Sequence, residues 1–109
     1  MLTTNLKFGE VYSLESQVAL DASRVSFSNI FGTGNGGVAL VGFKAGQKLD
    51  EHLAPAELMV YALEGEIEFI VADTPHTLRK GDFILVGEAV RHKVLAKTDA
   101  KMMLVKVKN

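Results

Sequence analysis

Residues 46–65 read GQKLDEHLAPAELMVYALEG, and residues 81–96 read GDFILVGEAVRHKVLA. Both stretches consist of short apolar runs bounded by glycine and by charged turn residues. In the first, the run Leu58–Leu63 is followed by Glu64-Gly65 and then by Glu66–Val71, which predicts two strands joined as a hairpin. Glu66–Val71 alternates charged and apolar residues, so one of its faces should be wet and the other part of a core.

The rest of the chain shows the same β-rich character, and no stretch has a convincing helical period. We expect further strands at residues 25–31, 37–43, 77–79, 83–86, 90–95 and 101–107. The segment Gly32–Gly37 matches G-x-G-x-x-G, but because no helix follows it we interpret it as a hairpin turn and not as a dinucleotide fingerprint. Residues 73–75 form another expected turn, and Glu10–Ala22 is expected to be a short edge strand or a single helical turn. Eight or more short strands predict an all-β sandwich or barrel, and a compact jelly roll fits this length best.

Composition narrows the classes of function. The 109 residues suffice for a single domain, 1–109, with a core of its own. Twelve Lys plus Arg against thirteen Asp plus Glu leave no basic surface for nucleic acid. The absence of cysteine excludes disulfides, thiolate metal sites and a thiol nucleophile. No membrane partner is expected, because no apolar run reaches about 18 residues; with no signal-peptide pattern at the N-terminus, we expect a cytoplasmic protein.

The two quoted stretches resemble the paired motifs of the cupin family, which are small double-stranded β-helix barrels of the jelly-roll type. The first family motif runs G-x5-H-x-H, three or four residues, Glu or Gln, six residues and Gly, and it corresponds to Gly46 through His52 to Gly65. The second runs G-x5-P-x-G-x2-H-x3-N and corresponds to Gly81 through His92 to Ala96. The resemblance implies a cupin barrel over the whole chain.

The family's usual metal ligands are the two His and the Glu or Gln of the first motif and the His of the second. His52 and His92 match ligand positions, whereas Ala54 and Leu58 stand where a His and an acid or amide are expected. Glu57 is one residue out of register, so strand alternation would aim it away from the interior that receives Leu58.

Two imidazoles are one short of the about three protein ligands of a catalytic zinc or iron(II) site. A third ligand would have to come from Asp50, Glu51 or Glu57, and Asp50 shares strand parity with His52 if the segment is extended. We therefore expect no tightly bound cofactor, with divalent metal binding as the alternative.

A ligand pocket is the other candidate feature. The residues with the parity to line a barrel are His52, Ala54, Leu58, Val60, Ala62, His92 and Val94. Such a lining is mostly apolar with few polar groups, as small-molecule sites often are. Alternatively, these side chains simply fill a small barrel. The aromatic residues Phe27, Phe31, Phe43, Phe69 and Phe83 are expected in the core, because each lies in an apolar β run.

Three functional hypotheses follow, and whether the protein is an enzyme stays open among them. The first is a small cytoplasmic cupin that binds a sugar-like or partly apolar small molecule without a tight metal. The second is a metal-dependent isomerase or oxygenase that uses His52, His92 and a nearby carboxylate. The third is an inert structural or dimerisation barrel. The resemblance implies a homodimer that pairs through sheet edges, although Lys101, Lys106 and Lys108 on the last strand would instead protect the edge of a monomer.

Overall fold

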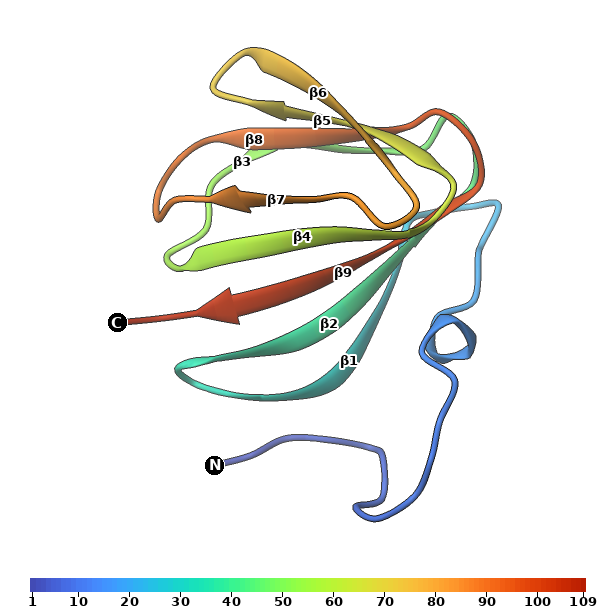
Figure 1. The fold of residues 1–109 in the computed structure, drawn as a ribbon, viewed down its shortest axis with the longest axis vertical. Coiled ribbons are helices and arrows are strands. Elements are labelled where there is room, and N and C mark those ends of the chain that lie inside the picture. The colour runs from blue at the N-terminus through green and yellow to red at the C-terminus, as the bar shows by residue number, and fades with distance from the viewer.

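The computed structural model describes residues 1–109 and contains two antiparallel sheets that face each other (Figure 1). The five-stranded sheet has the order β1 (Ser26–Thr33), β2 (Gly36–Phe43), β9 (Ala100–Val107), β4 (Glu57–Glu64) and β7 (Phe83–Val86). The four-stranded sheet has the order β3 (Lys48–His52), β8 (His92–Ala96), β5 (Glu66–Val71) and β6 (Thr74–Arg79). The chain passes repeatedly from one sheet to the other, which confirms the predicted all-β jelly-roll fold.

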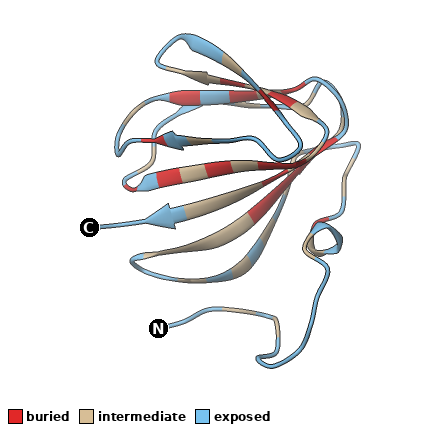
Figure 2. Cartoon of the chain, in the orientation of Figure 1, coloured by how far each residue is buried: buried red, intermediate tan, exposed pale blue.

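The core lies between the two sheets because each strand turns alternate side chains inward. Buried positions alternate with more exposed ones along β4 and β8, as the red bands of Figure 2 show. The largest fully buried side chains are Phe43 from one sheet and Phe69 from the other. Along β5, Ile67 and Phe69 are buried while Glu66 and Glu68 are not, so the predicted wet and dry faces are confirmed.

The segment before the first strand covers part of the outer face of the five-stranded sheet. Leu14 and Val18 pack there against Leu40 and Leu63, on either side of the short helix η1 (Glu15–Gln17). Of the two expectations for Glu10–Ala22, the single helical turn is the one observed. No helix of the structure is long enough to cross a bilayer, since η1 has only three residues.

The predicted hairpin between residues 58–63 and 66–71 is wrong, because the two strands belong to different sheets. β4 pairs with β7 and β9, whereas β5 pairs with β6 and β8. The chain crosses between the sheets at Gly65, whose φ is +76°. A methyl group there would collide with the Asp99 carbonyl oxygen, so only glycine fits this crossing.

The predictions of the other turns agree better with the structure. The Gly32–Gly37 segment forms a hairpin as predicted: the turn itself is Gly34-Asn35, and the flanking residues already belong to β1 and β2. The turn expected at residues 73–75 is instead formed by Ala72 and Asp73, which both have positive φ, and Thr74 already begins β6. Pro75 is tolerated inside β6 because that strand is an edge. The strand β3 was not predicted as such.

Two expectations fail because of where strands lie within the five-stranded sheet. Phe43 and Phe69 are buried, but Phe27, Phe31 and Phe83 are 64%, 44% and 56% exposed. These three side chains lie on β1 and β7, the two edges of the sheet, where neighbours cover only one side. The last strand, β9, is the central strand, so its lysines do not protect a sheet edge.

Candidate functional site

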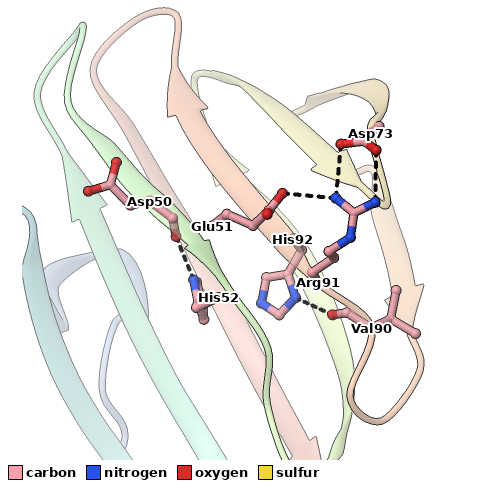
Figure 3. Close-up of polar contacts among 7 residues, drawn as sticks. All are labelled: Asp50, Glu51, His52, Asp73, Val90, Arg91 and His92. Atoms are coloured by element: carbon pink, nitrogen blue, oxygen red, sulfur yellow. Dashed lines mark hydrogen bonds and ion pairs between the residues drawn. The ribbon is translucent and has the colours of Figure 1, made fainter.

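The two motif histidines face each other across neighbouring strands. His52 on β3 is the register partner of His92 on β8, and the centroids of their rings are 4.3 Å apart at an interplanar angle of 64°. They come from the two motifs, 40 positions apart in the sequence, and antiparallel pairing brings them together (Figure 3). The arrangement is an edge-to-face contact between two imidazoles.

A β-bulge in β3 decides which side chains accompany His52. Leu49 pairs with Val94 and His52 pairs with His92, so three steps on β3 match two on β8. The extra residue breaks the strict alternation, and Leu49 and His52 both line the interior. The parity argument for Asp50 therefore fails: Asp50 also borders the interior, but its side chain is 89% exposed beside Lys48.

Backbone carbonyl groups fix the orientation and tautomer of both rings. His52 Nδ1 donates to the carbonyl oxygen of Asp50 at 2.8 Å, and His92 Nδ1 donates to that of Val90 at 2.9 Å (Figure 3). A carbonyl can only accept, so in the neutral form the proton of each ring is on Nδ1. Each Nε2 atom is consequently left with a lone pair that can accept a hydrogen bond.

The two rings differ in their surroundings. His92 is 3% exposed and stacks on Phe69 with ring centroids 5.6 Å apart, whereas His52 is exposed. Burial lowers the pKa of His92, and the nearby His52 adds to this effect, while the hydrogen bond to Val90 opposes it. His92 is therefore neutral at pH 7.

An interior cavity of about 380 Å³ opens beside the two histidines, and we call it the barrel cavity. Of the seven predicted pocket residues, five line it: His52, Ala54, Leu58, His92 and Val94. Val60 and Ala62 do not; both are buried within the core cluster. Strand alternation correctly predicted that these two side chains face the interior. It could not predict whether they lie beside the cavity or deeper in the packed core.

Ten of the fifteen residues that line the barrel cavity were not among the predicted pocket residues, and they include Phe27, Leu53, Leu104 and Lys106. Phe27 and Leu53 are 64% and 58% exposed although they line it. Phe27 is the register partner of Val41, a core residue, so its strand turns it to the inside. Leu104 and Lys106 also line the cavity from β9, where they follow Ala100 and Met102 on the inward face of the strand. The period-2 pattern of these strands was the signal that could have found Phe27 and Lys106.

The carboxylates proposed as a third metal ligand are engaged elsewhere. Glu57 Oε2 accepts the backbone N–H of Glu88 at 2.7 Å, so it caps the turn between β7 and β8. Glu51 lies 3.2 Å from Arg91 Nη1, and Arg91 also holds Asp73 with two hydrogen bonds (Figure 3). Arg91 lowers the pKa of Asp73 through these bonds and its charge.

The side chains at the site do not make up the donor set of a mononuclear metal centre. His52 and His92 supply two Nε2 atoms, and the positions that would complete the set hold Ala54 and Leu58. No group of three His, Asp or Glu side chains comes together anywhere in the chain. Zinc and iron(II) centres take about three or more protein ligands, so these residues do not fit such a metal.

Comparison with known proteins gives the context for this geometry. The model of a family described as "Cupin domain" matches residues 39–108, which is 70 of the 109 residues. Among curated proteins, Protein SchB of Streptomyces halstedii is 37% identical over 70 residues, which cover 63% of this chain and 49% of that protein. The chain thus spans about half the length of this curated relative.

Several solved structures have the same fold. A conserved Streptococcus pyogenes protein of unknown function superimposes with a TM-score of 0.89 at 22% identity, over 97% of this chain and 93% of that one. A cupin superfamily protein of Desulfitobacterium hafniense has a TM-score of 0.88 at 19% identity, over 97% of both chains. An RmlC-like cupin of Desulfovibrio desulfuricans has a TM-score of 0.80 at 28% identity, over 90% of this chain and 95% of that one.

Proposed function

The chain belongs to the cupin family, and from that premise we propose that it is a cytoplasmic protein that binds a small, partly apolar or sugar-like molecule in its barrel cavity, without a tightly held metal. The observation that carries this proposal is the pair Phe27 and Leu53. Both line the barrel cavity, yet both are more than half exposed. Large apolar side chains that face an interior space without covering each other favour a ligand that covers them.

The two histidines supply the polar part of the proposed contact. The Nε2 atoms of His52 and His92 are acceptors, because Nδ1 of each ring already donates to a carbonyl oxygen. A ligand with a hydroxyl or N–H group beside an apolar ring would match this lining. Phe69, which also lines the barrel cavity, stacks on His92 and holds that ring in place.

The donor set supports the metal-free form of the proposal. A metal-dependent isomerase or oxygenase would need a carboxylate from Asp50, Glu51 or Glu57. Glu51 is paired with Arg91, Glu57 caps a turn, and Asp50 lies beside Lys48. Purified protein should accordingly contain no stoichiometric metal, which elemental analysis would check.

Ligand screening by NMR tests the proposal directly. We expect small aromatic alcohols or monosaccharides to shift the side-chain resonances of His52 and His92, and Phe27→Ala to weaken binding of whichever compounds do so. Phe31→Ala is the matched control, since Phe31 lies on the same strand, is 44% exposed and lines no part of the barrel cavity. Equal weakening by both variants, or no shift with any compound, would contradict the proposal.

We extend the proposal to a homodimer that pairs through β7. Phe83 and Leu85 on this edge strand are 56% and 70% exposed, and they point away from the core that receives Ile84 and Val86. Large exposed apolar residues on an open sheet edge favour pairing with a second copy. Sedimentation analysis should give a dimer for the native chain and a monomer for Leu85→Asp. A native chain that sediments as a monomer would contradict the pairing.

A further inference from the structure

A second cavity, of about 510 Å³, adjoins the barrel cavity, and we call it the polar cavity. The two cavities share the lining residues Ala39, Ala54, Pro55 and Lys106. The N-terminal residues close one side of the polar cavity, since Thr3 exchanges two backbone hydrogen bonds with Gly32 at 2.8 and 3.0 Å. The barrel cavity is therefore bordered by a second cavity with a more polar lining.

The polar cavity is open because glycines, which have no side chain, line one side of it. Gly37 is the register partner of Lys106, so no side chain stands beside the Lys106 stem on β2. A methyl group at Gly37 would lie 2.5 Å from the carbonyl oxygen of Phe31, so the approach of β1 keeps this position a glycine. Gly36 and Gly34 also line the polar cavity. The hairpin that matches G-x-G-x-x-G thus contributes a wall in which Thr33 is the only residue with a side chain.

The polar cavity carries positive charge without an acidic counterpart. Lys106 and Lys108 line it, and no Asp or Glu does. The barrel cavity, which Lys106 also lines, has one acidic lining residue, Asp50, and that carboxylate lies 3.7 Å from the Lys48 amine. Neither lysine has a carboxylate within 4.0 Å, whereas Lys101 on the same strand donates to the Glu15 carbonyl at 2.6 Å and lies 3.9 Å from Glu64. An amine that is unpaired, and that stands where an apolar chamber meets a polar one, favours an anionic group on the ligand.

We propose that the ligand of this cupin is a small amphipathic carboxylate, whose apolar body lies in the barrel cavity against Phe27 and Leu53 and whose carboxylate meets the Lys106 amine. This inference rests on the proposed function and adds the charge and the orientation of the ligand. Lys106 is placed for this role by strand alternation, because Ala100, Met102 and Leu104 precede it on the inward face of β9. Lys108 adds to the positive potential from the adjoining polar cavity.

The test compares 2-naphthoate with 2-naphthamide, which share ring and size and differ in charge. We expect the native chain to bind the carboxylate about fivefold more tightly than the amide, as expected for one partly exposed ion pair. In Lys106→Met, which keeps an apolar stem of similar length, the two affinities should become equal. Lys80→Met is the control, because it removes the same charge from the exposed turn after β6 and lines neither cavity. Raising the salt concentration should weaken only the binding of naphthoate.

The outcomes separate this inference from the proposal it rests on. Equal binding of the two probes by the native chain would overturn the carboxylate inference and leave the apolar barrel site standing. A preference for naphthoate that Lys106→Met leaves intact would also overturn it. Failure of the native chain to bind either probe would count against both, and a heteronuclear NMR spectrum of each variant would confirm that it is folded.

Discussion

His52 and His92 are register partners on β3 and β8, and their ring centroids lie 4.3 Å apart. Each ring is oriented by a carbonyl oxygen two residues before it in its own strand segment, from Asp50 and Val90 respectively. Two imidazoles at this separation cannot both carry a proton without repulsion. Repulsion therefore disfavours the state in which both rings are cationic, and in a neutral ring the Nε2 atom is an acceptor beside the barrel cavity.

The pH titration of His92 should reflect this environment. Because burial and the neighbouring His52 lower its pKa, we expect an NMR titration midpoint below the usual value of about 6.5. His52→Asn removes the like charge and should raise the midpoint slightly, while burial keeps it below the usual value. A His92 midpoint at or above 6.5 in the native chain would contradict the structure of the site.

The same shift predicts how stability depends on pH. The folded state disfavours protonated His92, whereas the unfolded chain takes up that proton near pH 6.5. The contribution of His92 is thus fully present above pH 6.5, and it is lost as the pH falls from there through the lower pKa of the folded state. His92→Gln should flatten this part of the curve of unfolding free energy against pH. A curve that keeps its slope below pH 6.5 in His92→Gln would contradict this prediction.

Glu57 has a structural role that can be separated from metal binding. Its carboxylate accepts the N–H of Glu88 at 2.7 Å, and Ala89 in the same turn has a φ of +60°. Glu57→Ala should lower the unfolding free energy by about 1 kcal/mol, which is less than is usual for a hydrogen bond to a charged group because this one is exposed. Glu57→Gln, which keeps an acceptor oxygen, should cost less. Equal effects of the two variants in denaturant titrations would contradict the cap.

Gly65 should be far less tolerant of substitution than Gly46. Both have positive φ, +76° and +88°, so alanine costs about 1 kcal/mol at either from backbone conformation alone. At Gly65 the added methyl also meets the Asp99 carbonyl, while at Gly46 nothing lies within 4 Å. Gly65→Ala should therefore lower the melting temperature well beyond Gly46→Ala. Similar melting temperatures for the two variants would show that the sheet crossing tolerates a side chain.

Strand positions and side-chain directions were predictable from the sequence, whereas strand pairing was not. Local alternation correctly predicted most strands and the inward direction of Leu58, Val94 and Phe69, because side-chain parity is a property of a single strand. It could not show that β4 and β5 belong to different sheets, since Glu64-Gly65 suits a hairpin turn as well as a crossing. Strand order is a long-range property, and for that reason the exposed Phe83 on an edge was mistaken for core.

The two histidines of the candidate site were predictable from the sequence, but the other residues around them were predicted only in part. The motif spacing brought His52 and His92 forward, and alternation already directed Glu57 away from the interior, where the structure finds it capping a turn. The bulge in β3 could not be predicted, because neither Asp50 nor Glu51 is a residue type that marks a bulge in a sequence. Lys106 was interpreted as a residue that protects a sheet edge and not as a lining residue, because the sequence does not show that β9 lies in the centre of its sheet.

The sharpest prediction concerns the two ligand positions that hold apolar residues. Ala54 and Leu58 line the same cavity as both histidines, so Ala54→His with Leu58→Glu would assemble three imidazoles and a carboxylate around one space. Without metal, the double variant should be less stable than the native chain, since Leu58 is 5% exposed and a carboxylate there is buried without a partner. Added Zn²⁺ or Ni²⁺ should raise its melting temperature, by an amount equivalent to about 2.7 kcal/mol at a hundredfold excess over Kd. The native chain should show no comparable rise, because it lacks two of the four donors. If the folded double variant also shows no rise, then the Nε2 atoms of His52 and His92 do not point into the cavity, and the orientation inferred from their carbonyl hydrogen bonds is wrong.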